Sequence, residues 1–123
     1  MIEITEKIVV AYEMEITLKM IGGKCKPLIL HHLIENGKKR YNELYSVVDH
    51  IPKKTLTTQL RDMEADGLIK RIVHSKVPPK VEYCATELGQ SLYPILELMC
   101  DWGYNNIGDR FEVMKAQCSH EIE

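Results

Sequence analysis

Apolar residues recur at every fourth position in the first twenty residues, with acidic and basic residues between them. The series consists of Ile4, Ile8, Tyr12, Ile16 and Met20. Side chains four residues apart lie on one face of an α-helix. The series therefore predicts an amphipathic first helix that ends at the Gly22-Gly23 pair.

A second helical pattern follows the glycine pair. It is predicted to begin near Lys24, because Pro27 is tolerated only in the first turn of a helix, and to stop at Asn36-Gly37. Residues 38–41 are then predicted to form a short strand. Asn42 is expected to cap a third, shorter helix.

A longer amphipathic pattern begins after Pro52 and stops at Gly67. At about 100° per residue, one narrow stripe of this helix is apolar. The stripe consists of Leu56, Leu60 and Met63. We expect the stripe to pack on the core and the opposite side of the helix to face outward.

Two strand patterns, residues 68–75 and 81–85, flank the rigid pair Pro78-Pro79 and predict a hairpin. Thr86 is expected to cap a last helix that Pro94 bends. Three helices followed by a hairpin is the element order of a winged helix-turn-helix.

The predicted fold class is therefore mainly α with a small β-hairpin, in a single domain over residues 1–123. Its expected parts are an N-terminal dimerisation helix (1–21), a DNA-binding core with its wing (22–86) and a C-terminal dimerisation helix (87–118).

Charge is distributed unevenly along the chain, although the formal net charge is only −2. Residues 19–80 contain 13 Lys and Arg against 6 Asp and Glu, a balance of +7, whereas the two flanks contain 3 against 12, a balance of −9. The basic middle of the chain attracts phosphates locally, while the acidic flanks offset its positive charge in the protein as a whole. Charge alone also leaves open an ordinary solvated surface.

The helix that follows Pro52 carries hydrogen-bond donors and lysines in its first turns. Lysines at a helix N-terminus oppose the helix dipole, so a purely structural helix favours acids there. A helix that enters the major groove of DNA contacts base edges with its N-terminal residues. The expected DNA-binding residues of this helix are Lys53, Lys54, Thr55, Thr57, Thr58 and Arg61. Those of the wing and its flanks are Arg71, Lys76 and Lys80.

Apolar residues near both ends of the chain exceed what a small winged unit can bury. A second copy is expected to cover them in a two-fold homodimer, which implies an inverted-repeat operator. The expected dimer-interface residues are Ile4, Ile8, Tyr12, Leu92, Ile95, Leu96, Met99 and Trp102.

Other chemistry is sparse. The sequence contains no glycine-rich phosphate loop, HExxH motif or nucleophile elbow, so no enzyme, cofactor or metal site is expected. The adjacent His31 and His32 point about 100° apart on a helix and cannot share one ion.

No apolar run approaches the roughly 20 residues of a membrane span, and we expect a cytoplasmic protein. No CxxC pair occurs among the cysteines, which are Cys25, Cys84, Cys100 and Cys118.

Four blocks of sequence, in order, resemble the HxlR-type family of bacterial transcriptional regulators. They read GGKCKPLILHHL, KRYNELY, IPKKTLTTQLRDMEADGLIKR and VPPKVEYCATELGQSLYPILELMCDWG, and the resemblance covers about residues 18–103. It implies a homodimeric winged helix-turn-helix protein that binds operator DNA and represses or activates nearby genes. Residues that match the family's recognition helix are Lys54, Thr57, Gln59 and Arg61. Residues that match its wing are Pro78, Pro79, Val81, Glu82 and Tyr83.

The chain departs from the family pattern at three places. Cys25 replaces a usual tryptophan, Pro52 replaces a usual serine, and the region around Ala11 lacks the cysteine with which some relatives sense oxidants. Two alternatives stay open: a thiol-based or small-molecule sensor that uses Cys25 or Cys84, and a winged-helix protein-interaction module without DNA binding. A small-molecule effector is left open as a partner, with a pocket among Tyr93, Trp102, Tyr104 and Phe111.

Overall fold

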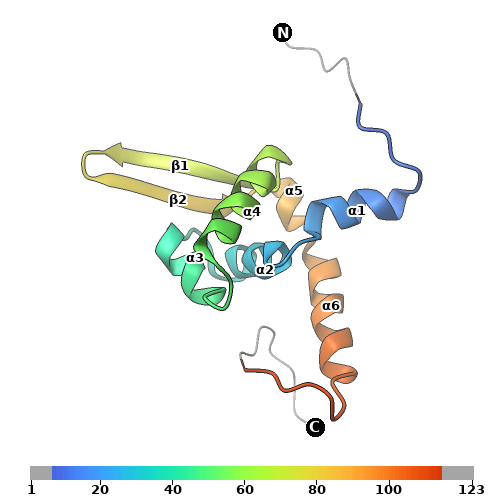
Figure 1. Ribbon diagram of the computed structural model, residues 1–123. Helices are drawn as coiled ribbons and strands as arrows, with labels where there is room; N and C mark the ends of the chain where they lie inside the picture. The colour runs from blue at the N-terminus through green and yellow to red at the C-terminus, as the bar shows by residue number, and fades with distance from the viewer. Residues whose placement is uncertain (1–6, 115–123) are drawn as a thin grey trace.

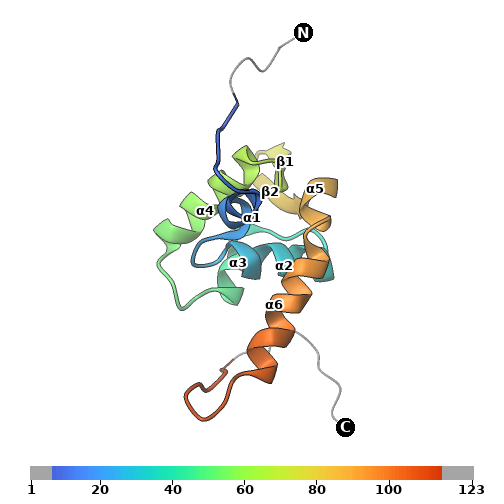
Figure 2. The ribbon, with the colours of Figure 1, turned by 90° about the vertical axis from the view of Figure 1, so that its right-hand side faces the viewer.

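The computed structural model describes residues 7–114. Its elements in chain order are α1 (Glu13–Ile21), α2 (Lys26–Asn36), α3 (Tyr41–Val47), α4 (Lys53–Ala65), β1 (Ile69–Lys76), β2 (Pro79–Ala85), α5 (Glu87–Gln90) and α6 (Tyr93–Asn105). The hairpin projects from the helical body on the side opposite to α1, and α6 extends away from both (Figure 1). A view turned by 90° shows the same projection of α6 (Figure 2). The predicted fold class is confirmed.

The core lies where α2, α3 and α4 meet the base of the hairpin. The predicted apolar stripe of α4 is fully buried there, against Ile29 and Leu30 of α2 and Leu44 of α3. Burial of a side chain of this size contributes roughly 1.5–3 kcal/mol, so the stripe fixes which side of α4 faces outward.

The hairpin is antiparallel, with Val73 opposite Val81 and Ile69 opposite Ala85, and its register shifts between Val73 and Ser75. The strand expected at residues 38–41 is only an isolated bridge. Lys39 and Tyr83 exchange backbone hydrogen bonds of 3.0 and 2.8 Å, which tie the α2–α3 connection to β2.

The first helix is shorter than predicted. It begins at Glu13, so Ile8 and Tyr12 precede it, and both are about three-quarters exposed. Ile4 lies outside the described residues. A four-residue repeat gives a stable short helix only where its apolar face packs, and here Ile8 and Tyr12 have no such cover in the single chain.

The predicted cap of α3 is wrong. Arg40 occupies the N-cap position and Asn42 lies inside the helix. The backbone N–H of Arg40 donates to Glu43 Oε1 at 2.9 Å, so the N-cap residue's own N–H is satisfied by the side chain three residues later, as in one half of a capping box.

The last predicted helix is two helices. Thr86 caps α5 as expected, because its Oγ1 accepts from the Gly89 N–H at 3.0 Å. Pro94, however, lies in the first turn of α6 and does not bend a continuous helix. A proline fits a first turn because no helical partner is needed for its missing N–H.

The prediction for Leu96 is also wrong. It was predicted at the dimer interface, but it is 2% exposed and belongs to the core of its own chain. Its side chain therefore has no free surface to offer a partner.

In the part of the chain that the structure describes, no helix combines the length and the hydropathy that a membrane crossing requires.

Two glycines give a matched test of this packing. A Cβ at Gly89 would lie 2.1 Å from the Leu68 carbonyl oxygen, which Thr86 holds in place by hydrogen bonds, whereas a Cβ at Gly103 would meet nothing within 4 Å. We expect Gly89→Ala to lower the free energy of unfolding by about 1–3 kcal/mol. Gly103→Ala should instead raise it by about 0.5–1 kcal/mol, because alanine favours a helix interior. Urea denaturation of both variants checks this, and similar effects would contradict the packing.

Candidate nucleic-acid interface

Helices α3 and α4 form a helix-turn-helix unit through residues 48–52. The Tyr41 hydroxyl, at the start of α3, donates to the Lys53 carbonyl at 3.1 Å and lies 3.0 Å from Thr57 Oγ1. Val48 and Ile51 of the connecting turn are buried. These contacts fix the first turns of α4 relative to α3.

The outer face of α4 gathers exposed donors. Four of the residues predicted to bind DNA are exposed: Lys53, Lys54, Thr58 and Arg61. The hydroxyl of the exposed Thr58 donates to the Lys54 carbonyl at 3.0 Å, which leaves its oxygen able to accept a hydrogen bond. The Lys53 ammonium lies 5.1 Å from the Tyr45 ring centroid, in a cation–π contact.

The other two predicted residues of this helix are less accessible. Thr55 and Thr57 are half-buried, and the Thr57 hydroxyl already contacts Tyr41. The structure therefore brings together Lys54, Thr58 and Arg61 on one open face, with Thr57 at its edge.

Gln59, which the family resemblance placed among the recognition residues, faces inward. Its Oε1 accepts from the Cys25 backbone N–H at 2.8 Å and from the Cys25 thiol at 3.1 Å. A Cβ at Gly23 would lie 2.8 Å from Gln59 Nε2, so the glycine turn packs directly on this side chain. Gln59 connects the α1–α2 turn to α4.

A prediction follows for Gln59. Replacing it with Ala leaves the N–H of the buried Cys25 without its acceptor, which costs about 1–3 kcal/mol of unfolding free energy. We expect thermal or urea denaturation to show this loss, while the relative affinities for different DNA sequences stay unchanged. A variant with native stability and altered sequence preference would place Gln59 at the DNA instead.

Two acidic residues, Asp62 near the C-terminal end of α4 and Asp66 at its C-cap, pair with neighbouring helices. Asp66 is 3.1 Å from Lys19 of α1, and Asp62 is 3.9 Å from Lys26 of α2. Lys26 is buried whereas its partner Asp62 is exposed. Each pair has one exposed partner, Lys19 or Asp62, so solvent and salt partly screen both attractions. Their effect is to separate positive and negative charge along the helix.

The hairpin carries the three other cationic residues that were predicted to bind DNA. They are Arg71, Lys76 and Lys80, and all three are exposed. Beside them, His74 Nε2 lies 2.6 Å from Glu82 Oε1 across the two strands. Sequence reasoning missed Arg40, an exposed side chain whose Nη2 lies 3.5 Å from the Pro79 carbonyl at the wing. The signal was the run Lys38-Lys39-Arg40 between two helices.

Cys25 is fully buried, and burial raises its thiol pKa to about 11 although Lys26 acts in the opposite direction. The thiol is therefore protonated at neutral pH and is a poor nucleophile. Cys84 is a free, half-buried thiol on β2, whereas Cys100 on α6 is disulfide-bonded, which the sequence pattern did not predict.

The structure contains a pocket of about 610 Å³ between α2, α3 and the residues that follow α6. Its walls include Leu28, Val47, His50 and Val113. None of the four aromatic residues suggested for an effector pocket lines this one. That suggestion assumed a cavity between the terminal helices, whereas this pocket lies beside α2 and α3.

Comparisons with known proteins agree with this geometry. Residues 20–111 match the family model described as HxlR-like helix-turn-helix. The chain is 52% identical over 105 residues, 82% of either chain, to the uncharacterized HTH-type transcriptional regulator YtcD of Bacillus subtilis.

Two solved structures are similar in fold. The redox regulator HypR in its reduced form is 46% identical with a TM-score of 0.74, covering 79% of this chain and 95% of HypR. The reduced form of the transcriptional regulator YodB from B. subtilis is 27% identical with a TM-score of 0.67, covering 85% of this chain and 100% of YodB. The chain is therefore a member of the HxlR-like helix-turn-helix family, a family of transcriptional regulators and not of enzymes.

Proposed function

We propose that this protein binds an inverted-repeat operator as a homodimer, with α4 in the major groove and the hairpin beside the adjacent backbone. The observation that supports this most is the outer face of α4. A helix whose opposite stripe is fully buried holds Lys54, Thr58 and Arg61 together in the open. Arginine and lysine donate to guanine, and hydroxyls pair with either donors or acceptors on base edges.

The wing residues have a different role in this proposal. Arg71, Lys76 and Lys80 are exposed on a hairpin whose two strands are held together by antiparallel pairing, so their charges reach phosphates at small ordering cost. Arg40 extends the same basic surface. Phosphate contacts of this kind orient the protein on DNA without reading its sequence.

Exposed apolar side chains on α6 and around the start of α1 support a homodimer. Tyr12, Leu98, Met99 and Trp102 are each about half or more exposed in the single chain. A second copy would cover this surface, which is unusually apolar for a monomer. We assign residues 1–21 and 87–118 to assembly, and residues 22–86 to DNA binding.

Two-fold assembly determines the form of the operator. Two copies of α4 related by a two-fold axis reach successive major grooves when their half-sites are about 34–36 Å apart. The operator is then an inverted repeat, and each half-site is read by one α4.

Neutralising the wing gives a prediction about salt. Replacing Lys76 and Lys80 together with Gln should weaken binding to all duplexes alike, because each lysine releases a counterion from the phosphate backbone. The slope of log K against log salt should become shallower by roughly 0.9 for each lysine–phosphate pair that the substitution removes. Anisotropy titrations from low to high salt measure this. An unchanged slope would exclude both lysines and favour Lys70 or Arg71.

One experiment separates DNA binding from the protein-interaction alternative. A gel shift with mixed genomic fragments at low salt should retard DNA, and high salt should abolish the shift. A module that binds only protein would retard none.

The sensor alternative is weaker at Cys25 than at Cys84. HypR is described as a redox regulator, but here the buried thiol of Cys25 has the raised pKa described above. Cys84 is the accessible one of the two. A thiol-reactive probe should therefore label Cys84 and spare Cys25 in the native protein.

A further inference from the structure

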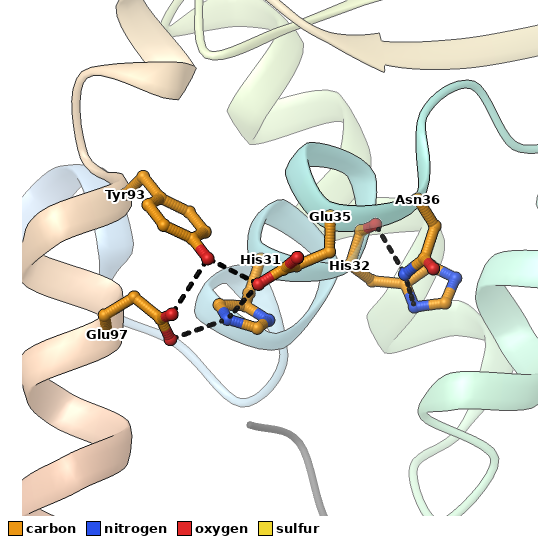
Figure 3. A network of polar contacts seen from close by, with 6 residues as sticks. All are labelled: His31, His32, Glu35, Asn36, Tyr93 and Glu97. Carbon is orange, nitrogen blue, oxygen red and sulfur yellow. Dashed lines mark hydrogen bonds and ion pairs between the residues drawn. The ribbon is translucent and has the colours of Figure 1, made fainter. Parts of the chain in front are cut away.

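A polar cluster joins α2 to α6 on the side of the body away from the wing. His31 and Glu35 of α2 point toward Tyr93 and Glu97 of α6 (Figure 3). His31 Nε2 lies 3.1 Å from Glu97 Oε2 and 3.7 Å from Glu35 Oε1. One nitrogen or oxygen atom from each of these three residues lies within 4.8 Å of the other two.

The distances from His31 Nε2 to the two carboxylates are close to those between ligands of one ion. Ligand atoms about 2.0–2.2 Å from a tetrahedral metal ion lie about 3.3–3.6 Å from one another. The distances from His31 Nε2 to Glu97 Oε2 and to Glu35 Oε1, 3.1 and 3.7 Å, bracket this value. The imidazole is 3% exposed, whereas the carboxylates of Glu97 and Glu35 are 34% and 44% exposed, so the buried nitrogen faces a site open on its carboxylate side.

Tyr93 orients both carboxylates. Its hydroxyl lies within hydrogen-bond distance of Glu35 Oε1 and of Glu97 Oε1, and its ring stacks on His31 with centroids 5.7 Å apart. A phenol has one hydrogen and can donate to only one carboxylate at a time. Two acids that share one hydroxyl and one imidazole create a concentration of negative charge that a cation would neutralise.

We propose that His31, Glu35 and Glu97 bind a divalent transition-metal ion of the Zn²⁺ type. Mixed nitrogen and carboxylate ligands suit such ions, whereas Mg²⁺ and Ca²⁺ prefer oxygen alone. Hydrogen bonds to ligating carboxylates, which Tyr93 supplies here, commonly support metal sites. The pocket of about 610 Å³, which His31 and Glu35 line, gives the ion a path from solvent.

The ion would connect two functional parts of the chain. Glu97 lies on the projecting helix α6, while His31 and Glu35 lie on α2 of the helix-turn-helix body. Metal binding therefore fixes the direction of α6 relative to α4. An effect on operator affinity rests on the proposed homodimer, but metal binding to the DNA-free protein does not.

Calorimetric titration of ZnCl₂ into tag-free, chelator-treated protein tests the site. We expect one Zn²⁺ to bind per chain and to raise the Tm. Mg²⁺ at the same concentration should do neither. Glu97→Gln, which keeps the side-chain shape, should weaken Zn²⁺ binding at least tenfold and remove the Tm increase. Glu35→Gln, on a more exposed side chain, is the second variant if the first folds poorly.

The matched control is His32→Ala. His32 is the adjacent histidine, but its ring contacts Asn36 and lies outside the cluster (Figure 3). This variant should bind Zn²⁺ as the wild type does. Absence of Zn²⁺ binding by the wild type, equal binding by both glutamine variants, or equal binding of Mg²⁺ would each overturn the proposal.

Discussion

Replacing Arg61 with Ala is expected to weaken operator binding by about 1–3 kcal/mol and to relax the preference for particular base pairs. Arg61 is exposed on the outer face of α4, so its removal takes away a donor fork for a base edge without opening the core. The free energy of unfolding should barely change. Anisotropy titrations against the operator and single-base variants measure both the affinity and the preference.

The control for Arg61 is Glu64→Ala, an exposed residue later in the same helix. Removing an acid there should leave operator affinity equal or slightly higher. Thr57→Ala is a less clean test, because it also removes the contact with Tyr41. An Arg61 variant that loses affinity equally for all sequences, or loses none, would show that this face does not read bases.

Replacing Leu98 or Trp102 with Asp is expected to abolish the homodimer and to reduce operator affinity on the order of 100-fold or more, because two linked half-sites reinforce each other. Both side chains are about two-thirds or more exposed in the single chain, so the monomer should stay folded. Light scattering of the wild type at micromolar concentration should give a species near twice 14.2 kDa. Leu96→Asp cannot serve, because it would bury an unpaired charge.

The control for assembly is Val77→Asp at the wing tip, another exposed apolar residue. It should leave the dimer intact. A Leu98 variant that remains dimeric would move the interface away from α6. A stable wild-type monomer that binds the operator tightly would remove the two-fold operator and leave the winged helix-turn-helix assignment in place.

The sequence predicted α4 and the hairpin well because local rules determine both. Leu56, Leu60 and Met63 recur at helical spacing and are buried, so the exposure of Arg61 follows from the same periodicity. Pro78-Pro79 between two apolar runs similarly located the turn of the hairpin. In these elements the periodicity, the breakers and the tertiary packing agree.

The errors occur where packing between distant segments decides. The four-residue repeat through Ile8 suggested a helix that the single chain does not cover. Leu96 reads as one more apolar residue of an amphipathic helix, and only the position of α6 against the body shows that it is buried. Pro94 was compatible with a bend or with a new helix.

The polar groups were the hardest to predict. Gln59 is polar and lies on the helix proposed to bind DNA, yet it faces Cys25, a residue 34 positions away. His31 and Glu97 are 66 residues apart in the chain. Nothing in either local pattern indicates the other, because side chains of such separation meet only through the tertiary fold.

Footprinting on an operator selected from genomic DNA is the most direct test of the proposed DNA-binding mode. Hydroxyl-radical cleavage in the presence of the wild-type protein should show two protected segments of related, inverted sequence. Their centres should be one helical turn apart, about 10–10.5 base pairs, or a multiple of it, with added protection beside each where the wing contacts phosphates. A single protected segment, or the absence of binding to any duplex at low salt, would contradict the account.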